Sequence, residues 1–141
     1  MERVLVSRCL LGEPCRWDGM RLDSNLKEIL KNHEIFSICP EVDAGLPCPR
    51  PKAEIARGDG YDVLDGVSIV IDGNGRDATA SFLKGAQIAL NLCLVNDIKK
   101  AILKDKSPSC GVNYIYIDGK LSAGLGVTAA LLTRHGVEII R

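Results

Sequence analysis

Five of the six cysteines lie where a thiolate could reach a metal. Cys9, Cys15, Cys39, Cys48 and Cys110 stand near glycine or proline, in predicted loops or at predicted strand ends. None of their spacings forms the C-x-x-C pair of zinc ribbons or ferredoxins, so any ligand set must come from separate loops. Soft thiolates select zinc, copper(I) or an iron–sulfur cluster, and spacing alone does not choose among these.

Other roles are open to the same residue type. Cys93 lies on the apolar face of a predicted helix, where a cysteine usually behaves as a small hydrophobe. Cys9 or Cys110 could act alone as a nucleophile, and Lys104 near Cys110 would favour the thiolate. Cys15 adjoins a charged turn and could be a simple surface thiol.

Polar residues close to these cysteines could move protons. Glu41 is two residues from Cys39 and seven from Cys48, so its carboxylate would lie near any site they build, although it could also only cap a turn. Ser107 and Ser109 could contact a substrate or cap the loop backbone.

Three short apolar segments predict strands that deliver cysteines to one place. They cover residues 3–7, 35–38 and 101–103, and the cysteines that follow them are Cys9, Cys39 and Cys110. Because ligands bind at the carboxyl ends of parallel strands, a site is expected at this edge of a sheet.

The remaining elements alternate along the chain. Helices are predicted over residues 26–33, 79–96 and 127–133, and strands over 67–71, 114–117 and 137–140. The apolar face of the first helix consists of Leu26, Ile29 and Leu30. The proline-rich segment 40–51 is predicted to be a rigid loop without helix. The pattern predicts a single α/β domain over residues 1–141, a three-layer α/β/α sandwich with a mostly parallel, Rossmann-like sheet.

Charge and composition limit the partners. The 18 basic and 18 acidic side chains cancel, which argues against nucleic acid or anionic lipid and favours a small molecule. The amino terminus has no signal-peptide pattern and no stretch is long enough to span a membrane, so a cytoplasmic protein is expected. In reducing cytosol, cysteines serve metal binding or catalysis before disulfides.

Read together, the loops resemble one known family. The motifs are Val-Ser-x-Cys-Leu-Leu-Gly at 6–12, Arg-Trp-Asp-Gly at 16–19, Cys-Pro-Glu-Val at 39–42, Phe-Leu-Lys-Gly-Ala at 82–86 and Ser-Pro-Ser-Cys-Gly at 107–111, with shorter matches at Gly45-Leu46, Pro49-Arg50 and 53–55. In this order they are similar to the thiouracil desulfurase family, formerly a domain of unknown function, over almost the whole chain.

The resemblance implies a four-iron four-sulfur cluster with three cysteine ligands and one open iron. Carried over to this chain, the ligands are Cys9, Cys48 and Cys110, with Cys39 as the first substitute for Cys48. The implied reaction is a non-redox desulfuration of a 2-thiouracil-like base to the oxo base and hydrogen sulfide, with the open iron as Lewis acid.

The expected reaction needs an acid–base group within hydrogen-bond reach of the substrate, and this assigns roles to the polar residues. Glu41 is the expected proton carrier and Ser109 a second catalytic residue, while Ser107, Arg50 and Asp18 are expected to bind the substrate. The alternative is a non-catalytic iron–sulfur or zinc protein, or a sulfur carrier, whose closed four-cysteine site leaves no open position.

Overall fold

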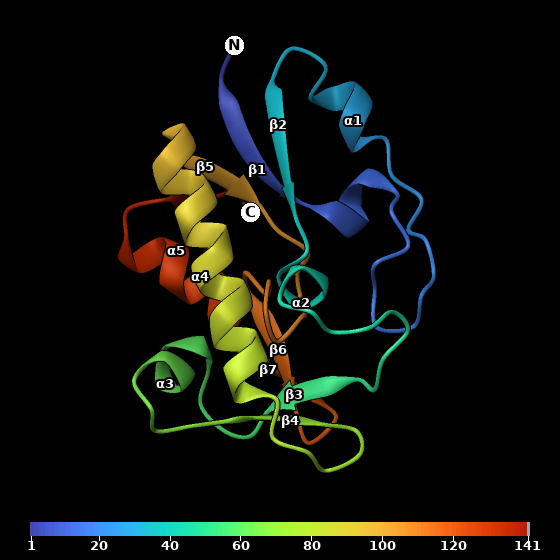
Figure 1. The fold of residues 1–141 in the computed structure, drawn as a ribbon, viewed down its shortest axis with the longest axis vertical. Helices are drawn as coiled ribbons and strands as arrows, with labels where there is room; N and C mark the ends of the chain where they lie inside the picture. The colour runs from blue at the N-terminus through green and yellow to red at the C-terminus, as the bar shows by residue number, and fades with distance from the viewer. Residues whose placement is uncertain (141) are drawn as a thin grey trace.

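A four-stranded parallel sheet organises the amino-terminal and carboxyl-terminal parts of the chain. The computed structural model describes residues 1–140. Its sheet contains β1 (Arg3–Ser7), β2 (Glu34–Ile38), β5 (Lys100–Ile102) and β8 (Glu138–Ile139), in the order β2-β1-β5-β8 (Figure 1). All three neighbouring pairs are parallel, in agreement with the predicted sheet.

Alternate residues of the central strand face two different layers. Leu5 packs in a core with the long helix α4 (Thr79–Asn96) and with α5 (Val127–Arg134), whereas Val4 and Val6 pack on the other face. That second face is covered by the 3-10 turn η1 (Arg8–Leu11) and by residues around the short helix α1 (Leu26–Ile29). The predicted single-domain α/β sandwich is confirmed.

Helix α4 has the predicted bounds because its apolar residues follow the helical period. The five residues predicted to face inward are all buried, namely Phe82, Ala86, Ala89, Leu90 and Cys93. The carboxylate of Asp77 accepts a hydrogen bond of 2.8 Å from the backbone N–H of Thr79 at the helix start. The helix ends at Asp97, which adopts the left-handed conformation with φ of 53°.

Helix α1 is shorter than predicted. It ends at Ile29 instead of continuing to His33, and Ile29 is 63% exposed although it was expected to face the core. Asn25 makes no side-chain cap hydrogen bond at its start, and a single turn gains little stability of its own. Of the predicted apolar face only Leu30, which directly follows the helix, is buried, so little packing supports a longer helix here.

The proline-rich segment contains a short helix that was not predicted. Helix α2 (Pro40–Asp43) follows β2 directly and begins with Pro40. A proline in the first turn of a helix costs little, because the N–H it lacks would have no helical partner there. The prediction that this segment contains no helix was therefore wrong at its first turn, which carries Glu41.

Two antiparallel strand pairs form a second part of the fold below the sheet in Figure 1. They are β3 (Ala53–Ile55) with β4 (Val70–Asp72), and β6 (Tyr114–Ile117) with β7 (Lys120–Ala123), and helix α3 (Gly60–Leu64) packs against α5. The predicted strand 67–71 thus begins later and lies outside the parallel sheet. Strand β7 was not predicted, because only one of its residues is even half-buried. No helix within residues 1–140 is long and apolar enough to cross a membrane.

Candidate active site

A cavity of about 280 Å³ opens at the carboxyl ends of three parallel strands. Its wall includes Ser7 and Ile38, the last residues of β1 and β2, and Lys104, which follows β5. The predicted position of the site, at this edge of the sheet, is therefore where the structure has its cavity.

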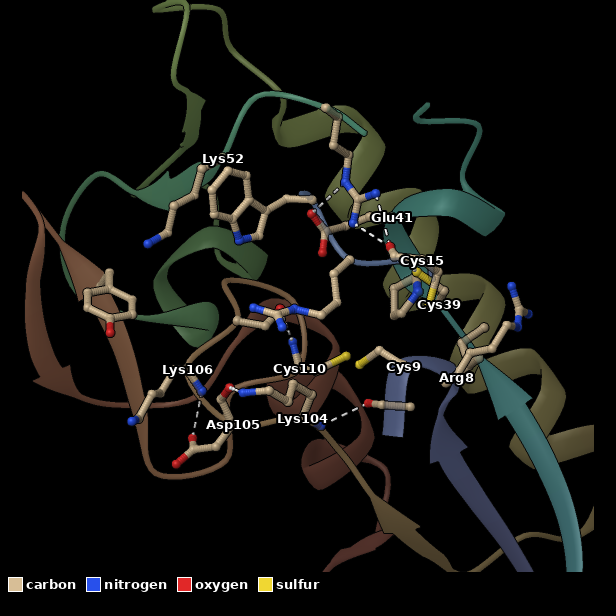
Figure 2. A pocket seen from close by; sticks show the side chains of 18 residues that line it. Arg8, Cys9, Cys15, Cys39, Glu41, Lys52, Lys104, Asp105, Lys106 and Cys110 are labelled. Atoms are coloured by element: carbon tan, nitrogen blue, oxygen red, sulfur yellow. Dashed lines mark hydrogen bonds and ion pairs between the residues drawn. The ribbon is translucent and has the colours of Figure 1, made fainter. Parts of the chain in front are cut away.

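Four of the six cysteines line this cavity, and they come from four different segments. They are Cys9 in η1, Cys15 in the loop that follows, Cys39 at the start of α2 and Cys110 in the loop after β5. In Figure 2 the side chains of Cys9 and Cys110 point toward each other, and Cys15 and Cys39 lie together beside them. All four are buried, which corrects the reading of Cys15 as a surface thiol.

An ion pair fixes the cysteine at the start of α2. The guanidinium of Arg8 binds both carboxylate oxygens of Asp43 at 2.9 Å, which ties η1 to α2. The carboxylate of Asp43 also accepts a hydrogen bond of 3.2 Å from the backbone N–H of Cys39. Bidentate arginine–carboxylate pairs are geometrically specific, so this contact orients Cys39 relative to Cys9, the neighbour of Arg8.

Two side chains shape the loop that carries Cys110. The hydroxyl oxygen of Ser107 accepts hydrogen bonds of 3.1 Å from the backbone N–H groups of Ser109 and Cys110. One carboxylate oxygen of Asp105 accepts four more from the backbone of the same loop, at 2.9 to 3.1 Å. Ser107 thus caps the loop and also lines the cavity.

The thiols of the cavity differ in how readily they ionise. The hydrogen bond from Cys15 lowers the pKa of Cys9 and outweighs the burial that raises it. Burial raises the pKa of Cys110 to about 12. The hydrogen bond with Cys15, followed by burial, raises the pKa of Cys39. For Cys15 the hydrogen bond with Cys39 lowers the pKa, but the hydrogen bond with Cys9 and burial raise it to about 11.

The cavity is basic although the chain as a whole is neutral. Two carboxylates line it, Glu41 and Asp105, against six cationic side chains, namely Arg8, Arg16, Arg50, Lys52, Lys104 and Lys106. A lining of this kind favours an anion, such as a thiolate-bound metal cluster or a deprotonated thiolated base.

Glu41 and Arg50 form a buried pair in the cavity wall. The Nε of Arg50 lies 3.3 Å from the Oε1 of Glu41, and their side chains are 4% and 14% exposed. Both Nη atoms of Arg50 also donate to the carbonyl oxygen of Cys15, at 3.1 Å each. Burial lowers the pKa of Arg50, but the charge and the hydrogen bond of Glu41 raise it by more, so the guanidinium of Arg50 stays charged.

Six predicted site residues lie in the cavity wall and three do not. Those in the wall are Cys9, Cys39, Cys110, Glu41, Arg50 and Ser107. The other three are held by other contacts. The sulfur of exposed Cys48 lies 2.9 Å from the carbonyl oxygen of Pro14. Ser109 is fully buried, with its hydroxyl 3.1 Å from that of Thr128, and the carboxylate of Asp18 accepts a hydrogen bond from the Met20 N–H and pairs with Arg16.

The opposite wall contains residues that the sequence analysis did not select. The Nζ of Lys52 lies 4.3 Å from the ring centroid of Tyr116 and 5.7 Å from that of Trp17, and all three line the cavity. Trp17 belongs to the Arg-Trp-Asp-Gly motif, and that is the signal that could have identified it. Two aromatic rings in one wall suit a planar heterocycle.

The donor set of the cavity fits an iron–sulfur cluster. Among the described residues no group of histidine, cysteine, aspartate or glutamate is arranged around a single metal ion. A cluster of several irons needs its cysteines spread around a larger volume, and four thiols surround the present cavity. Cysteine thiolates are soft sulfur donors, and these are the ligands that iron–sulfur clusters use.

Comparisons with known proteins agree with this geometry. The family model described as 2-thiouracil desulfurase matches residues 4–141. A protein of Bacillus subtilis (strain 168), the uncharacterized protein YbbK, is 38% identical over 97% of this chain and 93% of its own length. Among solved structures, the [4Fe-4S]-dependent thiouracil desulfidase TudS is 42% identical and superposes with a TM-score of 0.84, covering 99% of this chain and 90% of that one.

Proposed function

The chain belongs to the 2-thiouracil desulfurase family, and from that premise we propose that it removes sulfur from a thiolated pyrimidine with the help of a four-iron four-sulfur cluster. The observation that carries the proposal is the basic cavity with four cysteine thiols in its wall. The name of the similar protein TudS, a [4Fe-4S]-dependent thiouracil desulfidase, supports both the cofactor and the class of substrate.

We assign the cluster to Cys9, Cys39 and Cys110. Each follows the end of a parallel strand and lines the cavity, whereas Cys48 is exposed, does not line the cavity, and contacts the backbone oxygens of Pro14 and Arg16 through its sulfur. Cys39 is therefore preferred to Cys48 as the second ligand. When bound, the cluster supplies an iron without a protein ligand, a Lewis acid with affinity for the sulfur of a thiocarbonyl group.

The opposite wall would hold the substrate ring. Trp17 is 41% exposed, so one part of its indole is available for contact with a planar base, and Tyr116 stands across Lys52 from it. Lys52 is exposed and would leave its place between the rings when the base enters. Stacking positions the ring without regard to its substituents, so the cluster end of the cavity must recognise the sulfur.

Glu41 is the group that moves protons in the proposed reaction. The overall change adds water to the thiocarbonyl carbon, forms a C=O bond, breaks the C–S bond and releases hydrogen sulfide, without net oxidation or reduction. Arg50 binds Oε1 of Glu41, so Oε2 is the oxygen that takes a proton from water and returns it to the departing sulfur. Ser107 and the cationic side chains would stabilise charge on the base.

The test is anaerobic purification with iron and acid-labile sulfide counts, followed by addition of 2-thiouracil. We expect near-equal iron and sulfide, about four of each for a four-iron cluster, and release of uracil with sulfide. Cys39→Ala should lose the cluster and Cys48→Ala should keep it. The opposite pattern would return Cys48 to the ligand set. A cluster without turnover of 2-thiouracil would contradict the proposed desulfurase activity.

A cluster or sulfur carrier remains the second candidate function, because a fourth thiol lies in the same wall. If Cys15 bound the last iron permanently, no position would be open to a substrate. Binding of 2-thiouracil to the loaded protein, measured by the change in the absorption of the cluster, separates a closed site from an open one.

A further inference from the structure

Cys15 lines the cavity but has no part in the proposed three-cysteine ligand set. It is 8% exposed and packs in one buried cluster with Cys9 and Cys39, and the thiol of Cys39 lies 3.7 Å from its carbonyl oxygen. In Figure 2 it lies beside Cys39, on the side of the cavity that holds the other cysteines. Its sulfur is therefore next to two of the three proposed ligands and faces the same space.

The backbone of Cys15 is firmly held in this position. Its N–H donates a hydrogen bond of 2.9 Å to the carbonyl oxygen of Glu13, and its own carbonyl oxygen accepts two from Arg50 at 3.1 Å. Arg50 is itself held by Glu41. A ligand on a backbone that is already ordered loses little conformational freedom when it binds.

We propose that Cys15 is an exchangeable fourth ligand of the cluster. Without substrate, its thiolate binds the iron that Cys9, Cys39 and Cys110 leave open, and the sulfur of the incoming substrate displaces it. The inference rests on the cluster of the proposed function. The thiol gives up its proton to solvent when it binds iron and regains one when it is displaced, and no electron is transferred.

Exchange of this kind has two consequences of equal size. If Cys15 occupies the open iron for a fraction f of the time, loss of that iron to solution slows by a factor of 1/(1−f). The apparent dissociation constant of any external ligand rises by the same factor, because only the unoccupied form binds it. A tethered thiol acts at an effective concentration of about millimolar or more, and an occupancy of about nine-tenths would give factors of about ten.

The experiment compares wild-type protein with Cys15→Ala and Cys15→Ser after anaerobic cluster reconstitution. Limited oxidation with ferricyanide removes an exposed iron, and electron paramagnetic resonance follows the three-iron product. A parallel titration with sodium sulfide, read from the absorption of the cluster, gives the affinity of the open iron. We expect both variants to lose iron about tenfold faster and to bind hydrosulfide about tenfold more tightly than wild type.

Cys93→Ala is the matched control, because Cys93 is a buried cysteine of α4 outside the cavity. It should behave as wild type in both assays. Equal iron loss in wild type and Cys15→Ala would overturn the proposal, and so would unequal factors in the two assays, which indicate a structural effect. Correct exchange without turnover would keep this proposal and reject the desulfurase. A wild-type chain that assembles no cluster overturns both.

Discussion

Replacement of Asp105 tests whether the loop that carries Cys110 is built by one carboxylate. Its Oδ1 accepts hydrogen bonds from the backbone N–H groups of Lys106, Val112, Asn113 and Tyr114 at 2.9, 3.0, 3.0 and 3.1 Å. These contacts close the loop from its first residue to the start of β6. We expect Asp105→Ala to destabilise the fold and to reduce cluster binding, because Cys110 lies inside this loop.

The magnitude follows from the number and exposure of these bonds. A hydrogen bond to a charged acceptor contributes about 1.5 to 3 kcal/mol, but four donors share one oxygen and their contributions do not add. Lys106, Asn113 and Tyr114 are exposed, so water can replace part of what is lost. We therefore expect a loss of about 3 kcal/mol in the free energy of unfolding for Asp105→Ala, and about 1 kcal/mol for Asp105→Asn, whose amide oxygen still accepts.

The direction of the pKa shift of Asp105 determines how its contribution to stability changes with pH. Burial raises the pKa of Asp105, but the hydrogen bonds from the backbone of Asn113, Tyr114, Val112 and Lys106 lower it by more. The pKa of Asp105 in the folded protein therefore lies below that of the unfolded chain. The stabilisation is therefore complete above the unfolded pKa of about 4 and is lost as the pH falls through the lower folded value. The difference between wild type and Asp105→Ala should be constant from neutral pH down to about 5 and shrink below about 4.

Urea unfolding of the cluster-free protein at a series of pH values measures both quantities. Asp23→Asn is the matched control, because Asp23 is an exposed carboxylate in an irregular loop and should leave the unfolding midpoint unchanged. Equal stability of wild type and Asp105→Ala at neutral pH would refute the reasoning. A destabilisation that persists unchanged in acid would show that the charge of the carboxylate is not its cause.

Three further changes test other parts of the argument. Trp17→Ala should raise the KM for 2-thiouracil about tenfold with little change in kcat in steady-state assays, because base stacking contributes about 1 to 3 kcal/mol. Gly85→Ala should cost about 1 to 3 kcal/mol in urea unfolding and lower the iron content, because a Cβ there would overlap the backbone carbonyl of Pro40 and push α4 away from α2. Asp77→Ala should lower the Tm at pH 7 but not in strong acid, because the hydrogen bond from Thr79 lowers the pKa of the Asp77 carboxyl and is lost on protonation.

The local pattern of the sequence was sufficient to predict the main elements of the site. Helix α4 was predicted with its observed bounds, because its apolar period over 18 residues leaves no other interpretation. The strands before Cys9, Cys39 and Cys110 were also predicted, and parallel strands bring their carboxyl ends to one edge.

The direction of individual side chains could not be predicted in the same way. Cys48 and Cys39 are both next to proline, and only the folded chain shows that the sulfur of Cys48 contacts the backbone oxygens of Pro14 and Arg16, whereas Cys39 lines the cavity. Ser109 belongs to a motif with Ser107, yet its hydroxyl is buried against Thr128, a residue 19 positions away. Such contacts depend on tertiary packing, which a motif of five residues does not contain.

Each of the four cavity cysteines is positioned by a separate feature of the surrounding backbone, and this bears on how a cluster could be inserted. Cys9 follows β1 within η1, Asp43 holds the N–H of Cys39, Arg50 holds the carbonyl of Cys15, and Ser107 with Asp105 closes the loop of Cys110. Because each of these features involves protein groups alone, none of them requires a bound metal. We therefore expect cluster insertion to need little reordering of the chain, so that most of the binding free energy of the thiolates remains for holding the metal.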